Sequence, residues 1–264
     1  MWKFQTFAKI LRMKKEFITG ASSGIGNALA LAYAKRGVTI GLTARREEIL
    51  HEVAQACKEL GGIPFVYQLD VRDAEKCKSV ADQFMADAGG IDIAIANAGI
   101  GGDDGLYTGS SDQINMILNT NILGVTNTLM PFIPALKAQH SGALVCISSV
   151  ASFMPLPFHG GYAASKIAIR MIFDSWRPTL QKYKIKTVSI CPGFVDTPIV
   201  VGPARRFPMK SAEDAAEQFI KVIDLGYSTY IYPWPYRILI LIVQLTPERL
   251  YNWLIKKMFG KPIT

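Results

Sequence analysis

The chain reads Phe17-Ile18-Thr19-Gly20-Ala21-Ser22-Ser23-Gly24-Ile25-Gly26 close to its start, and residues 27–37 continue with an alanine-rich segment that ends in glycine. This order predicts a short strand, a turn and a helix. Gly20 permits a tight turn, Gly24 lets a pyrophosphate approach the backbone, and Gly26 lets the helix pack closely on the strand. Free amides at the helix start favour an anion. The pattern therefore predicts a phosphate-binding turn, with an ordinary glycine turn as the alternative.

Apolar runs and helical segments alternate through the first hundred residues. We expect further strands at 38–44, 64–71 and 91–99, and helices at 47–60 and from 73 to about 88. Four such alternations indicate the α/β class with a doubly wound parallel sheet of the Rossmann type. With 264 residues, of which 50% are apolar, the chain can bury this sheet as a single domain.

Two arginines, Arg45 and Arg46, directly follow the second expected strand. In a dinucleotide-binding fold this strand end faces the adenine ribose, where a carboxylate accepts from a 2′-hydroxyl and an arginine pairs with a 2′-phosphate. The arginine pair therefore favours NADP(H) over NAD(H), although either arginine could be simply a solvated charge. Asp70, at the end of the third expected strand, is interpreted either as an adenine contact or as a helix cap.

A second informative stretch is Tyr162-Ala163-Ala164-Ser165-Lys166. Residues four apart on a helix share a face, so the ammonium can sit beside the phenol and lower its pKa from the usual value of about 10. Such a phenol can exchange a proton with an alcohol or a ketone. Upstream, an expected buried strand at 143–147 is followed by Ser148 and Ser149, whose hydroxyls are available to a substrate oxygen. The alternative is an ordinary tyrosine–lysine pair on an amphipathic helix.

These motifs resemble those of the short-chain dehydrogenase/reductase family over about residues 14–230. Residues 19–26 are similar to its T-G-x-x-x-G-x-G turn, and Asn97-Ala98-Gly99 to its N-A-G motif. Residues 192–197, Pro-Gly-Phe-Val-Asp-Thr, resemble the P-G-x-x-x-T segment beside the nicotinamide. Asn121 is similar to the active-site asparagine of the family.

The resemblance implies an NAD(P)-dependent oxidoreductase. Ser149 lies thirteen residues before Tyr162, which is the spacing of the family's catalytic serine, and we therefore prefer it to Ser148. Tyr162 is expected to act as general acid toward a ketone or as base toward an alcohol, while NADP(H) exchanges the hydride. Ser149 is expected to polarise the same oxygen, and Lys166 to hold the nicotinamide ribose. Asn121 is expected to hold a water that links Lys166 to solvent.

The resemblance also implies which residues contact the cofactor. The expected set is Gly20, Ser22, Ser23, Gly24, Ile25, Gly26, Arg45, Arg46, Asp70, Val71, Asn97, Ala98, Gly99, Tyr162, Lys166, Pro192, Gly193, Val195 and Thr197. No metal is expected, because the four cysteines match neither a zinc pattern nor a C-x-x-C pair. They are interpreted as reduced core residues in a cytosolic setting.

The substrate is expected to be lipophilic, such as an acyl-chain ketone, a steroid or a retinoid. Residues 150–159 and 197–201 are mostly apolar and would border the substrate pocket in this fold, with core packing or a subunit contact as the alternative. Two other functions remain open: a broad-specificity soluble carbonyl reductase and a non-catalytic, NADPH-binding membrane adaptor. The resemblance further implies a homodimer or a homotetramer.

The positive charge is concentrated at the two ends. Five basic residues against one acidic residue give +4 in residues 1–16, and the same count gives +4 in residues 237–264, so residues 17–236 are neutral within the total of +8. This argues against nucleic-acid binding. We divide the chain into a basic amphipathic leader (1–13), a catalytic domain (14–230) and an apolar, basic extension (231–264). The extension is expected to lie on an anionic membrane or to cover a partner subunit; the protein is expected in the cytoplasm, with the inner face of a membrane as an option.

Overall fold

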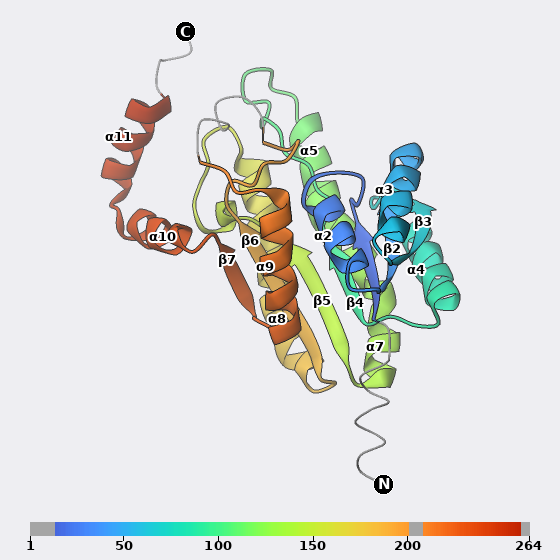
Figure 1. The fold of residues 1–264 in the computed structure, drawn as a ribbon. Helices are drawn as coiled ribbons and strands as arrows, with labels where there is room; N and C mark the ends of the chain where they lie inside the picture. The colour runs from blue at the N-terminus through green and yellow to red at the C-terminus, as the bar shows by residue number, and fades with distance from the viewer. Residues whose placement is uncertain (1–13, 201–207, 260–264) are drawn as a thin grey trace.

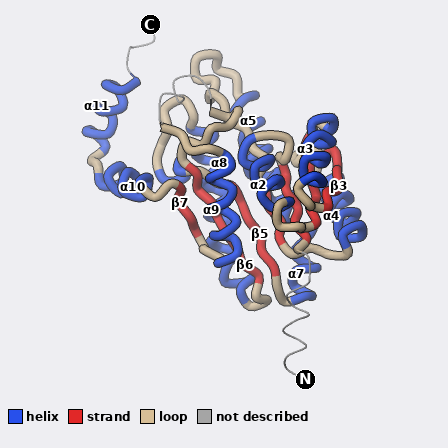
Figure 2. The backbone as a smooth tube through the Cα atoms, in the orientation of Figure 1, coloured by secondary structure: helices blue, strands red, loops and turns tan. Residues whose placement is uncertain are grey.

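The computed structural model describes residues 14–200 and 208–259 and confirms the α/β class. Within these ranges, seven parallel strands form one sheet in the order β3-β2-β1-β4-β5-β6-β7 (Figures 1 and 2). The strands are β1 (Lys15–Thr19), β2 (Thr39–Ala44), β3 (Ile63–Gln68), β4 (Ile93–Ala96), β5 (Gly142–Ile147), β6 (Ile185–Pro192) and β7 (Thr229–Tyr232). The order reverses between β1 and β4, and ligands of such sheets bind at this switch point, beyond the carboxyl ends of the strands.

Helices cover both faces of the sheet. One face carries α2 (Gly24–Ala34), α3 (Glu47–Glu59) and α9 (Ala212–Leu225), whose core includes Leu29, Leu50 and Phe219. The other carries α4 (Ala74–Ala88), α6 (Gly124–Leu129) and α8 (Gly160–Gln181), whose core includes Phe84, Leu129 and Phe173. Because both faces are covered, β2 and β4 are buried at every position. The shorter helices are α5 (Asp112–Leu118), η1 (Asn119–Leu123), η2 (Met130–Phe132), α7 (Ile133–Gln139) and η3 (Val150–Phe153).

Two strands end earlier than the sequence predicted. The strand expected at 64–71 ends at Gln68, and the one expected at 91–99 ends at Ala96. In both cases the residues that follow leave the ladder and make side-chain contacts at the carboxyl edge of the sheet. The four cysteines are free and buried, as predicted. The leader expected at 1–13 lies outside the described residues.

The C-terminal segment begins inside the sheet. β7 pairs with β6 and runs through Tyr232, so it crosses the boundary drawn between residues 230 and 231. Beyond it, α10 (Pro235–Leu245) and α11 (Glu248–Phe259) extend from the edge of the sheet (Figure 1). No helix in the described part of the chain has the length and apolar character needed to cross a membrane.

Candidate active site

The glycines of the first turn sit where side chains would collide. Gly20 and Gly24 have positive φ angles of 69° and 55°. A Cβ on Gly20 would lie 2.9 Å from the Ala98 Cα, and one on Gly26 would overlap the Gly20 carbonyl oxygen. A Cβ on Gly24 would lie 3.1 Å from the Thr197 Cβ, so the turn after β1 meets the segment after β6. The turn is therefore held tightly against two other strand ends.

Asn97 and Ala98 hold this turn in place. The Asn97 Nδ2 donates to the Thr19 carbonyl oxygen (2.9 Å) and to the Gly20 carbonyl oxygen (3.2 Å). The backbone amides of Asn97 and Ala98 both donate to the Thr19 Oγ1, at 3.1 and 3.2 Å. Asn97 thus positions the turn, because its side-chain Nδ2 donates to two carbonyl oxygens of the turn itself.

The amino end of α2 offers unpaired amides to an anion. Ser23 is the N-cap of α2, yet its side chain makes no capping hydrogen bond, so the first-turn amides keep their donors free of a side-chain acceptor. The Arg46 Nη2 donates to the Ser22 Oγ (3.1 Å) and lies 3.5 Å from the Ser23 Oγ. This turn has the backbone space, the donors and the positive charge that a dinucleotide phosphate requires, so these residues fit such a cofactor.

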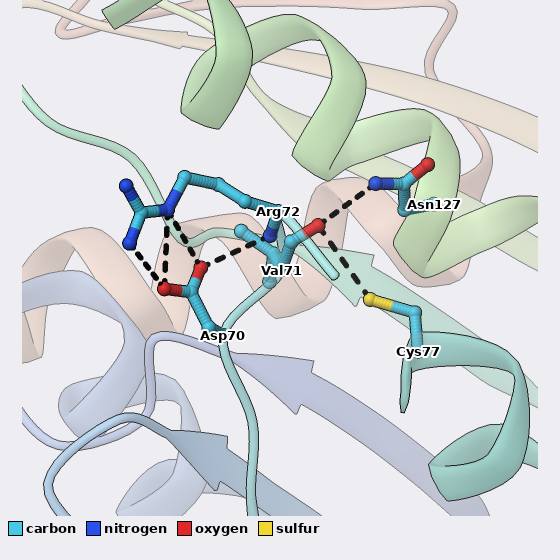
Figure 3. Close-up of polar contacts among 5 residues, drawn as sticks. All are labelled: Asp70, Val71, Arg72, Cys77 and Asn127. Carbon is cyan, nitrogen blue, oxygen red and sulfur yellow. Dashed lines mark hydrogen bonds and ion pairs between the residues drawn. The ribbon is translucent and has the colours of Figure 1, made fainter. Parts of the chain in front are cut away.

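Asp70 is held by a neighbour that the sequence did not single out. The Arg72 Nε donates to the Asp70 Oδ1 (3.0 Å) and its Nη2 donates to the Oδ2 (2.5 Å), while the Arg72 backbone amide donates to the Oδ1 (3.0 Å) (Figure 3). These hydrogen bonds hold the pKa of Asp70 below its usual value. The cap of α4 is Asp73, which accepts from the Lys76 amide, so the capping interpretation of Asp70 is wrong.

Val71 is fixed through its carbonyl oxygen. This oxygen accepts from the Asn127 Nδ2 (3.0 Å) and lies 3.6 Å from the Cys77 Sγ (Figure 3). A Cβ on Gly124 would collide with the Val71 side chain, so α6 packs directly against this turn. The Asp70-Val71 turn is consequently anchored to both α4 and α6.

Ser149, Tyr162 and Lys166 converge beyond the ends of β5 and β6. Ser149 follows β5 and hydrogen-bonds the Tyr162 phenol. The Lys166 Nζ is buried, donates to the Ile147 carbonyl oxygen (2.9 Å), and lies 5.7 Å from the centre of the Tyr162 ring. The helical spacing therefore brings the tyrosine and the lysine to one face of α8, as predicted.

The predicted effect of Lys166 on the phenol is not what this arrangement produces. Burial raises the pKa of Tyr162, and the hydrogen bond from Ser149 only partly opposes this. Burial also lowers the pKa of Lys166 to about 8. The physical reason is that Lys166 directs its ammonium to the Ile147 carbonyl, so that desolvation dominates both groups.

The two adjacent serines differ in their contacts. The Ser148 Oγ donates to the Lys166 carbonyl oxygen (2.9 Å), which ties β5 to α8. The Ser149 Oγ accepts from the Ala151 amide (3.1 Å) and lies 3.5 Å from the Pro192 carbonyl oxygen. Of the two serines, Ser149 is the one that acts on the pKa of Tyr162, and its catalytic role stays a prediction.

Asn121 lies in a single π-helical turn, η1, and is fully buried. Its Nδ2 donates to the Ile100 carbonyl oxygen (2.9 Å) and to the Ser165 Oγ (3.0 Å), and its Oδ1 accepts from the Ile100 amide (2.9 Å). A Cβ on Gly99 would lie 3.1 Å from the Asn121 Oδ1 and 3.3 Å from the Lys166 Nζ. Asn121 therefore joins the loop after β4 to α8, and its water-holding role stays a prediction.

The segment after β6 completes the site. Gly193 donates its amide to the Tyr232 carbonyl oxygen (2.6 Å), and Val195 and Thr197 are buried. The Thr197 Oγ1 donates to the Val195 carbonyl oxygen (3.2 Å) and its side chain faces Gly24. This segment thus lies between the phosphate turn and the Ser149–Tyr162 pair.

A separate open hollow of about 490 Å³ lies beside the site. It is lined by Ser152, Phe153, Met154, Pro155, Leu156, Gly160, Ala163, Ala164, Ile167, Arg170 and Gln244. These residues lie on η3, the loop after it, a side of α8 turned away from Tyr162, and α10. The apolar loop expected to border the substrate pocket lines this hollow, and its part in binding substrate stays a prediction.

The comparisons with known proteins agree with this geometry. The family model described as short chain dehydrogenase matches residues 14–205. An uncharacterized oxidoreductase of Myxococcus xanthus is 31% identical over 238 residues, which cover 89% of this chain and 93% of the relative. The hydroxysteroid 11-beta-dehydrogenase 1-like protein B of Xenopus laevis is 31% identical over 231 residues, covering 85% of this chain and 79% of the relative.

Among solved structures, the alcohol dehydrogenase of Thermococcus sibiricus complexed with 5-hydroxy-NADP is 29% identical with a TM-score of 0.75, covering 83% of this chain and 95% of that chain. This chain belongs to the short-chain dehydrogenase family, because the family model matches residues 14–205 and the sheet has the expected doubly wound order. It is an NAD(P)-dependent oxidoreductase of that family.

Two positioning residues escaped the sequence analysis. Arg72 holds Asp70, and Ser165 accepts from Asn121 while donating to the Tyr162 carbonyl oxygen (2.7 Å). An arginine two residues after a strand-end aspartate is a usable signal for the first. Ser165 carries no such signal, because its contact joins segments 44 residues apart in sequence.

Proposed function

We propose that the protein interconverts a lipophilic ketone and its secondary alcohol, with NADP(H) as the preferred cofactor. The observation that carries this proposal is the convergence of Ser149, Tyr162 and Lys166 next to the glycine turn. When bound, the dinucleotide supplies or accepts the hydride. Its phosphates fit the amino end of α2, as the geometry of Gly20, Gly24 and Gly26 allows.

Tyr162 handles the proton in this mechanism. Because burial raises the pKa of Tyr162, the phenol stays protonated at neutral pH and can donate to the oxygen of a ketone. Ser149 hydrogen-bonds the phenol and is placed to hydrogen-bond the same oxygen. Lys166, with a pKa of about 8, is poised to return a proton toward the tyrosine near neutral pH. This arrangement favours the reductive direction.

The preference for NADP(H) rests on the arginines around the adenosine side of the site. Arg46 reaches the serine hydroxyls of the phosphate turn. The positive charge of Arg45 helps to lower the pKa of Asp70. Arg72 neutralises Asp70 by a bidentate contact, which reduces the repulsion that this carboxylate would exert on a 2′-phosphate. The alcohol dehydrogenase of Thermococcus sibiricus, whose solved structure is complexed with 5-hydroxy-NADP, supports the preference for NADP(H).

The lipophilic substrate class is supported by exposed apolar side chains at the carboxyl edge of the sheet. Ile199 is 45% exposed and faces Gly101 from the segment after β6. Tyr107 is also exposed and stacks on Phe158 at 5.7 Å, which joins the loop after β4 to the loop before α8. These side chains are not core. The likeness to a hydroxysteroid dehydrogenase-like protein is in keeping with this class.

A homodimer or homotetramer remains part of the proposal. Ile167 and Met171 on α8, together with Leu123 and Met130 on neighbouring helices, are exposed apolar side chains that a second copy could cover. Sedimentation velocity of the purified protein gives the state directly.

The reaction is tested with Tyr162→Phe. We expect turnover of a lipophilic ketone to fall by about 10³-fold or more, because the proton donor is removed, while NADPH binding measured by fluorescence stays within about twofold. Ser148→Ala is the matched hydroxyl deletion, since Ser148 only ties β5 to α8. If Tyr162→Phe kept full turnover, Tyr162 would not be the proton donor. If the native protein oxidised NADPH with none of a panel of ketones, the non-catalytic adaptor would be the better account.

A further inference from the structure

Helix α10 presents its apolar face to the outside. It packs inward through Tyr236, whose ring lies against Gly193 and 6.5 Å from the Phe194 ring, and through the buried Ile240. Its other side carries exposed apolar side chains that recur three or four residues apart, which places them on one face of the helix. We call this set the outer face of α10: Trp234, Ile238, Leu241, Ile242 and Leu245.

This orientation is the reverse of an ordinary surface helix, which turns its polar side to water. Leu245 is 82% exposed and Leu241 is 58% exposed. A contiguous apolar surface of this kind marks a place where another surface binds. We therefore expect the outer face of α10 to bind another surface.

The same C-terminal segment carries positive charge. Arg237, Arg249 and Lys257 are exposed, and Lys257 lies 5.2 Å from the centre of the Trp253 ring on α11. Residues 237–264 carry five basic residues and one acidic residue, whereas residues 17–236 are neutral. Apolar and tryptophan side chains bordered by lysine and arginine are the combination that binds the interface of an anionic bilayer.

A second copy of the chain fits this surface less well. A symmetric contact between two outer faces would bring two strongly basic segments together, and like charges at close range oppose association. An anionic lipid surface complements both the apolar side chains and the charges. Since α10 has 11 residues and therefore spans about 16 Å, it can lie in the interface but cannot cross a hydrocarbon core of about 30 Å.

Helices α10 and α11 contact segments that border the active site. Tyr236 on α10 contacts the segment after β6, and the Tyr251 hydroxyl on α11 donates to the Pro155 carbonyl oxygen (2.6 Å) in the loop after η3. A surface bound to α10 and α11 is thus fixed relative to the segments that follow Ser149 and Pro192.

We infer that the outer face of α10, with the basic side chains of α11, docks the protein on an anionic lipid surface and holds the active-site entrance beside it. This goes beyond the proposed reaction and does not depend on it.

The test is flotation of the full-length protein with vesicles, read by the amount of protein bound rather than by activity. Vesicles of phosphatidylcholine mixed with phosphatidylglycerol are compared with vesicles of phosphatidylcholine alone. We expect the native chain to bind the anionic vesicles at least about tenfold more tightly. Leu241→Ser combined with Leu245→Ser should lower that affinity by about tenfold or more, because two exposed leucines leave the bilayer interface.

Matched controls separate the surface from general effects. Leu225→Ser on α9 removes an equally exposed leucine (71%) outside the outer face and should leave vesicle binding unchanged. Arg249→Glu combined with Lys257→Glu should weaken binding to the anionic vesicles by about tenfold, whereas Lys58→Glu on α3 should not.

Two results would overturn the proposal. The first is equal binding by the native chain and the Leu241→Ser/Leu245→Ser variant, or equal binding to both kinds of vesicle. The second is a native chain that binds neither vesicle but loses mass in sedimentation when the leucines are replaced, because the outer face would then be a contact between copies.

Discussion

Helices α2 and α10 are each 11 residues long and rich in apolar side chains, yet they meet opposite surroundings. In α2 seven residues are buried, and the helix packs between the sheet, α3 and α9 (Figure 1). In α10 only Ile240 is buried among its residues, and most of the remaining apolar side chains face outward.

This contrast shows that an apolar composition indicates that a helix has a surface to bury, but not which surface covers it. The partner of α2 lies within the chain, so its small residues and glycines are adapted to close contacts with neighbouring strand ends. In our proposal the partner of the outer face of α10 lies outside the chain, and the aliphatic side chains of that face are exposed. Substitutions near α2 should therefore change folding and cofactor binding, whereas substitutions on the outer face of α10 should change neither.

Gly26→Ala, at the start of α2, should have the largest effect. The new Cβ would overlap the Gly20 carbonyl oxygen and press on the Asn97 amide, so the turn must move. We expect a loss of about 3 kcal/mol in the free energy of unfolding and loss of NADPH binding, measured by urea denaturation and fluorescence. Gly101→Ala is the control, because its Cβ would make an ordinary 3.6 Å contact with Ile199. Equal stability of the two variants would contradict the close packing of α2.

Lys166 is the buried counterpart of the exposed Lys257. Its pKa falls to about 8 in the folded protein, while in the unfolded chain it stays near its usual value of about 10.4, so the unfolded state binds more protons between these limits. The unfolding free energy contributed by Lys166 therefore rises with pH in this window.

Between about pH 7.5 and 9.5 the native chain should gain about 2 kcal/mol relative to Lys166→Met, measured by urea denaturation of both proteins. The comparison with the variant removes the opposite effect of the buried cysteine thiols, whose raised pKa values lower stability at high pH. Parallel pH profiles would show that the lysine is not desolvated. Lys257→Met, the exposed control, should leave the profile unchanged.

Arg46→Ala tests the charge beside the amino end of α2. We expect the KM for NADPH to rise by about tenfold with little change in the KM for NADH, since a charge-assisted contact to the 2′-phosphate is lost. Arg36→Ala is the control, because Arg36 pairs with Glu217 away from the turn. A parallel rise for both cofactors would mean that Arg46 only shapes the turn.

The smallest effect belongs to α10. Leu241→Ser combined with Leu245→Ser should change the free energy of unfolding by less than about 0.5 kcal/mol, because both side chains are exposed. Ile240→Ser, which changes the residue directly before Leu241 on the buried side of α10, should cost about 2 kcal/mol or more in the same denaturation experiment. Similar losses in both variants would show that the outer face is packed against the protein.

The sequence predicted the parts of the fold that rest on local pattern. The glycine turn, the alternation of strands and helices, and the shared face of Tyr162 and Lys166 follow from spacing alone, and the structure contains them. The contact between Asn121 and Ser165 joins segments 44 residues apart through side-chain directions that no spacing encodes. The clamp of Arg72 on Asp70 is local, and the spacing of two residues would have indicated it. The raised pKa of Tyr162 was missed because it depends on burial, which the spacing of residues does not show.

The central claim, hydride transfer between NADPH and a lipophilic ketone, is tested most directly by kcat/KM for a series of methyl ketones of increasing chain length at saturating NADPH. We expect kcat/KM to rise by about fourfold for each methylene group that the site buries, and Tyr162→Phe to abolish turnover across the series. Values of kcat/KM that are independent of chain length, or no oxidation of NADPH with any member, would contradict it.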